Sequence, residues 1–210
     1  MKRARSPVRP PDSRTDGRVA RGVRVHDAIL RAMLDLIEKG NLAPTSPEIA
    51  AHAGVSLRAL FNHFKDADSL RAAAIERQAL EEAELFVAPI PADRPLEHRI
   101  RAYAEQRARF LEGITPYRRA AVAYEHFSPP VAEGLRRARE RTRLQVEQVF
   151  APELAALNPK ERRKLAAMLV VAGSWPTWDT LRSPLNFSRA EAKAAVTEML
   201  HRILESGRSP

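Results

Sequence analysis

The segment Ile29–Leu70 reads ILRAMLDLIEKGNLAPTSPEIAAHAGVSLRALFNHFKDADSL, and it decides the fold. From Val25 to Ile37, apolar residues recur at the spacing of one helix face. Gly40 then supplies the kind of residue at which helices commonly end. We therefore expect a first helix that begins near Val25 and ends before Gly40.

Two short helices should follow, each beginning at a residue whose hydroxyl can cap it. Thr45 can accept a hydrogen bond from the first turn of a second helix, and Ser56 can do the same for a third. Between these helices, Gly54 can adopt the left-handed conformation of a tight turn. The third helix carries Leu60 and Phe64 on one face at i, i+4 spacing. Three short helices with a glycine turn between the last two are typical of a helix-turn-helix.

The remainder of the chain also favours helices. Glycine occurs only 8 times, and β-branched residues never form an alternating run. Asp66 can cap a fourth helix to about Phe86, and the proline-rich residues 87–95 would break it and form a hinge between two lobes. We predict an all-α protein of about nine helices. Its parts would be a basic, disordered arm over 1–24, a helix-turn-helix domain over 25–70 and a helical C-terminal domain over 71–210. The later helices are expected near 96–112, 116–127, 130–150, 159–182 and 188–205, and Pro176 should disturb the fourth of these.

Composition narrows the class of partner. The net charge of +9 indicates an acidic partner, either nucleic acid or an anionic membrane surface. The longest apolar stretch, Leu165 to Trp175, is shorter than the roughly 18 residues of a membrane span, and the basic start lacks the apolar run of a signal peptide. We expect a cytoplasmic protein with no membrane partner. The absence of cysteine excludes disulfides, thiolate zinc sites and a cysteine nucleophile.

The helix-turn-helix segment resembles the DNA-binding domain of the tetracycline-repressor (TetR) family of transcriptional regulators. The resemblance rests on the string IAAHAGVS at Ile49–Ser56, on Phe61, His63 and Phe64, and on the start of the next helix at Asp68 and Leu70. It implies a homodimer that binds double-stranded operator DNA, with residues 71–210 dimerising and binding an unknown small-molecule effector. The resemblance also favours a repressor of transcription that leaves its operator when the effector binds, which is the commoner mode of action in the family.

The third helix should read DNA through its outward face. Arg58 suits guanine O6 and N7, and Asn62 suits adenine or a phosphate. The resemblance places His63 near a phosphate, and the alternative is a histidine that only packs or caps a helix. The sequence departs from the family at Ala59, where threonine is usual, at Phe61, where tyrosine is usual, and at Ala67, where Lys65 would replace a usual lysine. The predicted DNA-binding residues are Thr45, Ser46, Ser56, Leu57, Arg58, Ala59, Phe61, Asn62, His63 and Lys65.

The charge is concentrated ahead of the helix-turn-helix. Residues 1–24 carry eight Lys or Arg and two Asp, whereas residues 26–70 carry four Lys or Arg and six Asp or Glu. We expect the arm to follow the phosphates or to enter the adjacent minor groove, which would make binding strongly salt-dependent. The alternative is a solvated tail without such a role.

The C-terminal domain contains candidates for a cavity and for a dimer interface. By resemblance, aromatic residues of its helices could line the effector cavity, although most aromatics at helical spacing fill a core. Several arginines (Arg118, Arg119, Arg136, Arg137 and Arg139) would suit an anionic ligand, unless they lie on a solvated face. The cavity candidates are Tyr103, Phe110, Tyr117, Tyr124, Phe127, Trp175 and Trp178. The last two long helices carry apolar stripes, and the resemblance implies that they pair with their copies in a second subunit; the alternative is packing within the chain. The dimer candidates are Leu165, Met168, Leu169, Val196, Met199, Leu200 and Ile203.

Other functions find little support in the sequence. No nucleophile elbow, P-loop or dinucleotide-binding glycine motif occurs, and none of the 6 histidines pairs at the spacing of a helical metal site. We therefore expect no enzymatic activity, cofactor or metal. The alternative function is a ligand-independent structural or nucleoid-associated protein that uses the same helix-turn-helix. A sealed C-terminal core would favour that role, and a ligand cavity would favour a sensor.

Overall fold

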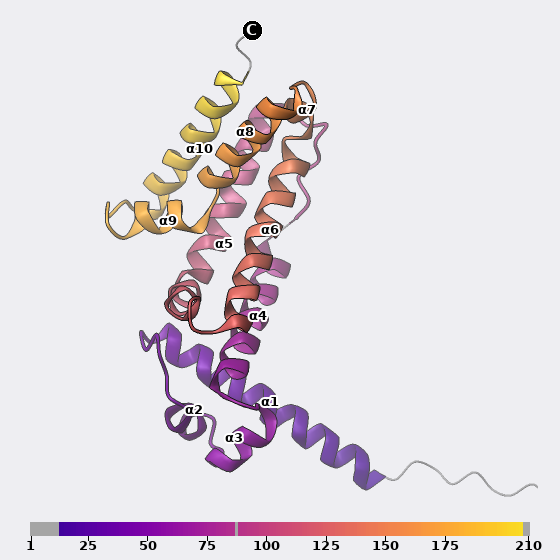
Figure 1. The fold of residues 1–210 in the computed structure, drawn as a ribbon, viewed down its shortest axis with the longest axis vertical. Helices are drawn as coiled ribbons and strands as arrows, with labels where there is room; N and C mark the ends of the chain where they lie inside the picture. Colours follow the sequence, from indigo (N-terminus) through magenta and orange to yellow (C-terminus); the bar gives the residue numbers. More distant parts are fainter. Residues whose placement is uncertain (1–12, 87, 208–210) are drawn as a thin grey trace, which may run out of the picture.

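The computed structural model describes residues 13–86 and 88–207, and these residues form an elongated molecule of packed helices (Figure 1). The predicted all-α class is confirmed, since no strand occurs within the described ranges. The helices in those ranges are α1 Ser13–Glu38, α2 Ser46–His52, α3 Leu57–His63, α4 Ala67–Phe86, α5 Leu96–Tyr124, α6 Pro129–Val149, α7 Ala151–Ala155, α8 Pro159–Ala172, α9 Trp175–Arg182 and α10 Arg189–Ser206.

An N-terminal lobe forms around α1, α2, α3 and the start of α4. Its core contains Ile29 and Met33 from α1, Ile49 from α2, and Leu60 with Phe64 from α3. Gly54 has φ +68°, so the tight turn between α2 and α3 uses the left-handed conformation expected there. The three-helix arrangement predicted from the caps and the apolar spacing is therefore confirmed.

The helix α1 begins much earlier than Val25. Residues 13–24, predicted as part of a disordered arm, form the first turns of α1, which run out from the lobe past α3 (Figure 1). After Pro11 no proline occurs until Pro44, so nothing stops a helix from extending towards the N-terminus once residues 25–38 are packed. The prediction was wrong for residues 13–24, and residues 1–12 lie outside the described residues.

The helix α5 runs unbroken through a position where two helices were expected. Pro116 lies inside it, and the predicted gap between 112 and 116 is absent. Proline cannot donate to the carbonyl four residues earlier, and Thr115 directs its hydroxyl to the Leu111 carbonyl at 2.6 Å, so the axis bends instead of breaking. Figure 1 shows the last turns of α5 almost end-on as a result.

The opposite correction applies to residues 159–182, which form two helices. The helix α8 ends at Ala172, Gly173 follows it, and Ser174 precedes α9. Pro176 therefore lies in the first turn of α9, where its missing N–H leaves no hydrogen bond unmade. This proline starts a helix, so the predicted bend within one long helix was wrong.

A second core fills the C-terminal lobe between α5, α6, α8 and α10. Tyr103, Leu111, Val146, Leu169 and Leu200 are all buried in it. The lobes contact each other through α4, which packs against both α5 and α6, and through α1, which packs against α5.

The linker before α5, predicted as a hinge, packs against the C-terminal lobe in its described part. Ile90 packs on the C-terminal core, and the Gln106 side chain donates to the Ala88 carbonyl at 2.6 Å. The described part of the linker therefore belongs to the C-terminal lobe. The helix α4 connects the lobes.

Candidate nucleic-acid interface and ligand cavity

The helix α3 presents one face to the core and the other to solvent. Ser56 caps it by accepting a hydrogen bond from the Ala59 amide at 3.1 Å. Leu60 and Phe64 are buried, which turns the positions between them outwards. Arg58 and Asn62 are exposed on that outward face, as expected from the sequence.

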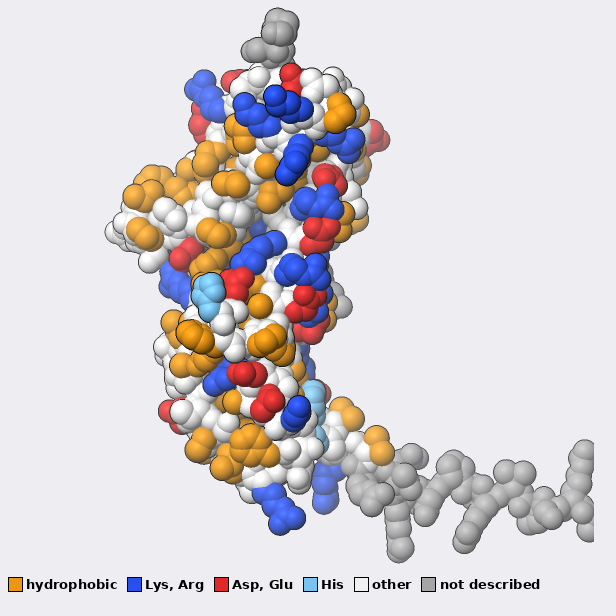
Figure 2. Space-filling view, viewed as in Figure 1, with side chains coloured by type: hydrophobic (Ala, Val, Ile, Leu, Met, Phe, Trp, Pro, Cys, Tyr) orange, Lys and Arg blue, Asp and Glu red, His pale blue; other side chains and the backbone are white. Residues whose placement is uncertain are grey.

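Two apolar side chains share the outward face of α3. Leu57 is 42% exposed and Phe61 is 45% exposed, at i, i+4 spacing beside Arg58 and Asn62. Ala59 is half-buried between them. In the space-filling view, Lys and Arg side chains protrude beside apolar ones at the end of the molecule that carries α2 and α3 (Figure 2). A short helix with exposed apolar, amide and guanidinium groups has the side-chain chemistry that reads base edges.

The start of α2 forms a capping box that uses the hydroxyl of Thr45. The backbone amide and the hydroxyl of Thr45 both donate to Glu48 Oε2 at 2.7 Å. These hydrogen bonds hold the pKa of Glu48 below its ordinary value, so the carboxylate stays charged at the helix N-terminus. Thr45 is therefore engaged within the chain, and Ser46 is half-buried beside it.

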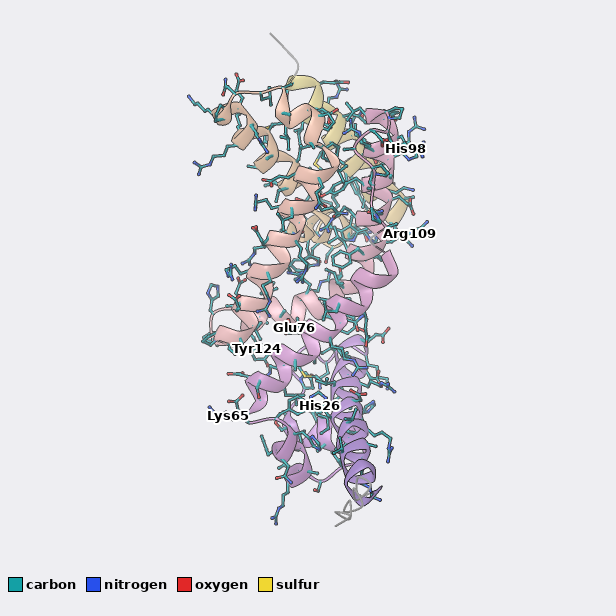
Figure 3. The ribbon with its side chains drawn as sticks, turned by 90° about the vertical axis from the view of Figure 1, so that its right-hand side faces the viewer. His26, Lys65, Glu76, His98, Arg109 and Tyr124 are labelled. Atoms are coloured by element: carbon teal, nitrogen blue, oxygen red, sulfur yellow. The ribbon has the colours of Figure 1, made fainter. Side chains whose placement is uncertain are left out.

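Histidines join α1 to the end of α3. The ring of His26 stacks on Phe64 with centroids 4.8 Å apart and meets His63 edge-on at 6.2 Å. His63 is half-buried, so it packs against α1 while keeping part of its surface in solvent. Lys65 is exposed in the turn that leads to α4, on the same lobe as His26 (Figure 3).

The N-terminal part of α1 passes beside α3. A Cβ placed on Gly22 would lie 4.0 Å from Cε1 of His63, which fixes how closely the two helices approach. Arg21 and Arg24 flank this contact and are exposed, as is Val23. The helical extension therefore sets cations next to the candidate reading helix.

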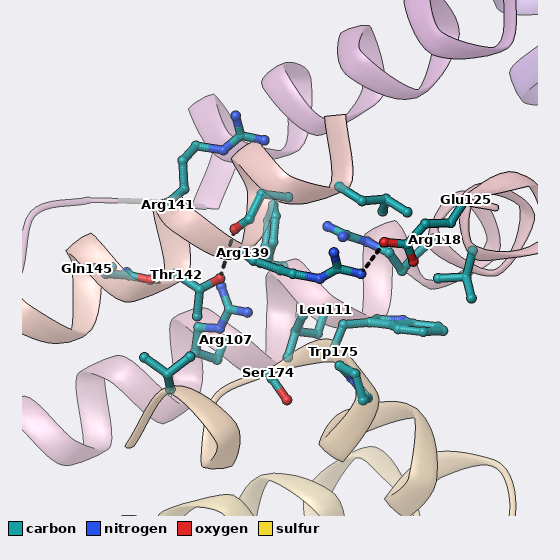
Figure 4. A pocket seen from close by; sticks show the side chains of 16 residues that line it. Arg107, Leu111, Arg118, Glu125, Arg139, Arg141, Thr142, Gln145, Ser174 and Trp175 are labelled. Carbon is teal, nitrogen blue, oxygen red and sulfur yellow. Dashed lines mark hydrogen bonds and ion pairs between the residues drawn. The ribbon is translucent and has the colours of Figure 1, made fainter. Parts of the chain in front are cut away.

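A cavity of about 480 Å³ opens in the C-terminal lobe, with walls from α5 and α6 and from the junction of α8 and α9 (Figure 4). Its apolar wall includes Phe110, Leu111, Leu135, Val170 and Trp175. The volume lies within the range of sites that hold small molecules. The ring of Trp175 is fixed by a hydrogen bond from Nε1 to the Thr115 hydroxyl at 3.2 Å.

Only part of the predicted aromatic set lines this cavity. Phe110 and Trp175 do, whereas Tyr103 and Trp178 are fully buried in the core instead. Phe127 is 80% exposed. Helical spacing alone does not distinguish a cavity wall from a core, which explains these errors.

Two further predicted cavity residues lie where the lobes meet. Tyr117 packs against the N-terminal core. Tyr124 holds the guanidinium of Arg71 4.2 Å from its ring centre, which ties the end of α5 to the start of α4 (Figure 3). Both tyrosines therefore join the two lobes.

Four arginines reach the cavity, and the sequence drew attention to two of them. Arg118 and Arg139 were considered for an anionic ligand, whereas Arg107 and Arg141 were missed. A usable signal existed for Arg107, because it lies four residues after Tyr103 on the apolar face of α5. A cation within an apolar stripe is expected to be buried, and a buried charge needs hydrogen bonds or an ion-pair partner.

Most of the predicted dimer residues fill the core of their own chain. Leu165, Leu169, Val196 and Leu200 are buried, so they cannot form the surface of a partner interface. Met199 and Ile203 are partly buried against the same core, and Met168 is 37% exposed. An apolar stripe on a helix predicts that the face is buried, but it does not distinguish burial within the same chain from burial against a second subunit.

Solved structures with a similar fold include transcriptional regulators. No protein-family model and no curated protein matches the sequence. A transcriptional regulator from Rhodococcus shares 20% identity over 90% of this chain and 99% of its own, with a TM-score of 0.63. A protein assigned to the TetR family from Mesorhizobium loti shares 17% identity over 89% of this chain and 98% of its own, with a TM-score of 0.60.

These likenesses establish the fold. The chain adopts the helical fold of TetR-type transcriptional regulators, so the resemblance expected from the helix-turn-helix segment is confirmed at that level. Within the described residues, no cluster of three or more His, Asp or Glu side chains could hold a metal ion. Among the described helices, none has both the length and the apolar character needed to cross a bilayer.

Proposed function

We propose that the protein is a cytoplasmic, homodimeric regulator of transcription that binds operator DNA through α3 and is released from it by a small-molecule effector. The observation that carries the proposal is the outward face of α3, where Arg58 and Asn62 stand exposed beside Leu57 and Phe61. Arg58 has no ion-pair partner among the described residues. Its guanidinium is therefore available for bidentate hydrogen bonds to guanine in the major groove.

The proposal is tested with DNA from upstream of the protein's own gene. Saturable binding that persists in an excess of unrelated competitor DNA would support a sequence-specific regulator. Binding that the competitor abolishes would instead support the nucleoid-associated role and overturn this proposal.

The basic part of α1 supports the same interface. Residues 26–70 are net negative, so attraction to phosphates must come from elsewhere, and Arg21 and Arg24 are exposed on the turns of α1 that pass α3. We propose that these two arginines contact the DNA backbone as the helix passes the groove. This replaces the idea of a disordered arm for residues 13–24 with a helical one.

The double variant Arg21→Gln, Arg24→Gln should bind DNA with a shallower dependence on salt. Each lost phosphate contact reduces the slope of log affinity against log salt by about 0.9. The slope is measured by fluorescence anisotropy between two salt concentrations. The control is Arg101→Gln, Arg109→Gln in α5, which changes the net charge equally at exposed positions of the other lobe, away from the interface proposed below. Equal slopes for the two double variants would exclude the contacts of α1.

Dimerisation would occur on the exposed side of α8. Met168 and Val171 are 37% and 62% exposed at i, i+3 spacing, so they form an apolar surface that the chain itself leaves uncovered. The neighbouring helix α10 adds the partly exposed Met199 and Ile203. A symmetric interface here would supply the two reading heads that a palindromic operator requires.

The double variant Met168→Arg, Val171→Arg should shift the protein from dimer to monomer. Four added cations would face one another across a two-fold interface, and each would have to be desolvated. Light scattering coupled to size exclusion gives the mass directly. The control Leu80→Arg places a cation at another exposed apolar position, in α4, and should remain a dimer. A double variant that remained dimeric would show that the dimer interface does not lie on this side of α8.

The cavity supports a sensor over a purely structural protein, because the C-terminal core is not sealed. Arg118 and Arg141 line the cavity and also a much smaller space of about 30 Å³ against α4, where Glu76 lies. Arg137 of α6 pairs with Glu76 at 3.1 Å. Because α4 begins directly after α3, an occupant that shifts α5 or α6 would move the reading helix. Operator affinity falls only if the occupant prefers the shifted state.

A further inference from the structure

The cavity holds more positive than negative charge. Among its lining residues, Arg107, Arg118, Arg139 and Arg141 are cationic, and Glu125 is the one carboxylate (Figure 4). Glu125 is already engaged, since its Oε1 accepts from Nη2 of Arg139 at 2.6 Å. The guanidinium groups of Arg107, Arg118 and Arg141 therefore have no carboxylate partner among the residues that line the cavity. In the space-filling view, Lys and Arg side chains lie in a hollow midway along the molecule (Figure 2).

Arg107 is the most deeply placed of these cations. It is 6% exposed, its Nε donates to the Gly173 carbonyl at 2.8 Å, and its guanidinium lies 5.2 Å from the centre of the Phe110 ring. Neither terminal nitrogen has a hydrogen-bond partner among the described residues, and Arg107 is one of the residues that line the cavity. Burial lowers the pKa of Arg107, because little surrounds it that stabilises the charge.

Arg118 faces the same space from the next turns of α5. Within the described part of the chain it makes no hydrogen bond or ion pair. Its pKa is lowered to about 10, first by burial and then by repulsion from Arg107, Arg139 and Arg141. The group stays charged at neutral pH, so the cavity concentrates unsatisfied cations in a partly desolvated place. Such an arrangement is costly unless an anion joins it.

We propose that the effector of this cavity is an organic oxyanion, a carboxylate or phosphate group attached to an apolar body. The oxyanion would be held between Arg107 and Arg118, whose forked guanidinium groups match its geometry. The apolar body would lie against Phe110, Leu135, Val170 and Trp175. This inference rests on the proposed function, because it names the chemistry of the effector.

The test measures binding of matched probes to the full-length protein without DNA. The probes are 4-phenylbutanoate, 4-phenylbutyl phosphate and the neutral 4-phenylbutan-1-ol, which share one apolar body. Binding is followed by tryptophan fluorescence, since Trp175 lines the cavity, and confirmed by calorimetry. We expect at least one of the two anions to bind at least tenfold more tightly than the alcohol, and their ranking distinguishes the headgroups.

The variant Arg118→Leu should weaken binding of the preferred anion at least tenfold and leave binding of the alcohol unchanged. The control Arg136→Leu removes an exposed α6 arginine that does not line the cavity, and it should bind all three probes like the original protein. Circular dichroism shows that each variant is folded. Equal binding of alcohol and anions, no saturable binding of either anion, or equal effects of the two variants would overturn the inference.

The outcome is separable from that of the proposed function. Protein that binds the anion but no specific DNA would contradict the regulator and leave the anion site standing. Protein that binds specific DNA but no anion would contradict only the anion site.

Discussion

Replacing Glu153 with alanine should lower the free energy of unfolding by about 3 kcal/mol, since it leaves a buried guanidinium without its carboxylate. Arg99 is 3% exposed and donates to both carboxylate oxygens of Glu153, at 2.6 and 2.7 Å. The same guanidinium reaches the carbonyls of Arg94 and Val149 at 2.8 and 2.7 Å. This network fastens α5 to the end of α6 and to α7. Urea denaturation at fixed protein concentration measures the change.

A surface ion pair provides the control for that variant. Arg202 and Glu198 of α10 pair at 2.7 Å, but both are largely exposed. Water screens such a pair, so Glu198→Ala should change the midpoint of unfolding very little. Similar losses in Glu153→Ala and Glu198→Ala would show that the buried pair does not hold the C-terminal lobe together.

Replacing Gly173 with alanine should destabilise the protein by about 1–3 kcal/mol through overpacking. The new Cβ would lie 2.9 Å from Cε1 and 3.0 Å from Cζ of Tyr103. The tyrosine ring is held by Phe150, whose ring centre is 5.6 Å away, so it has little room to move. Because the Gly173 carbonyl accepts from Arg107, the same shift should disturb the cavity.

Two further variants test that explanation. Tyr103→Phe removes a buried hydroxyl that has no hydrogen-bond partner in the described chain, so it should partly rescue Gly173→Ala in a double variant. Gly134→Ala, where a Cβ would meet open space within α6, should instead stabilise by about 0.5–1 kcal/mol. A Gly173→Ala protein as stable as Gly134→Ala would refute the close approach of α8–α9 to α5.

The N-terminal lobe could be predicted because its signals are local. The caps at Thr45 and Ser56, the glycine turn at Gly54 and the pair Leu60 and Phe64 each act within a few residues, and the structure has all of them. The outward face of α3 followed from the same spacing. Its contacts with DNA remain predictions.

The C-terminal lobe was less predictable because its signals depend on packing between distant segments. Pro116 lies inside a helix and Pro176 at the start of one, and the sequence around each does not separate the two cases. Leu165 and Val196 lie on apolar stripes as expected, yet the stripe could not show that their own chain covers them. The cluster around Arg107 forms only when residues of α5 and α6 come together.

The central claim is that α3 reads a DNA sequence, and the most direct test compares Arg58→Ala with Arg101→Ala on DNA from upstream of the gene. Both arginines are exposed and both variants lose one charge, but Arg101 lies on α5 in the other lobe (Figure 1). A bidentate contact to a base contributes about 1–3 kcal/mol, so Arg58→Ala should lose roughly tenfold or more in specific affinity, with its binding to unrelated DNA little changed. Arg101→Ala should retain the original affinity. If the two variants bound the specific DNA equally well, α3 would not be the reading helix.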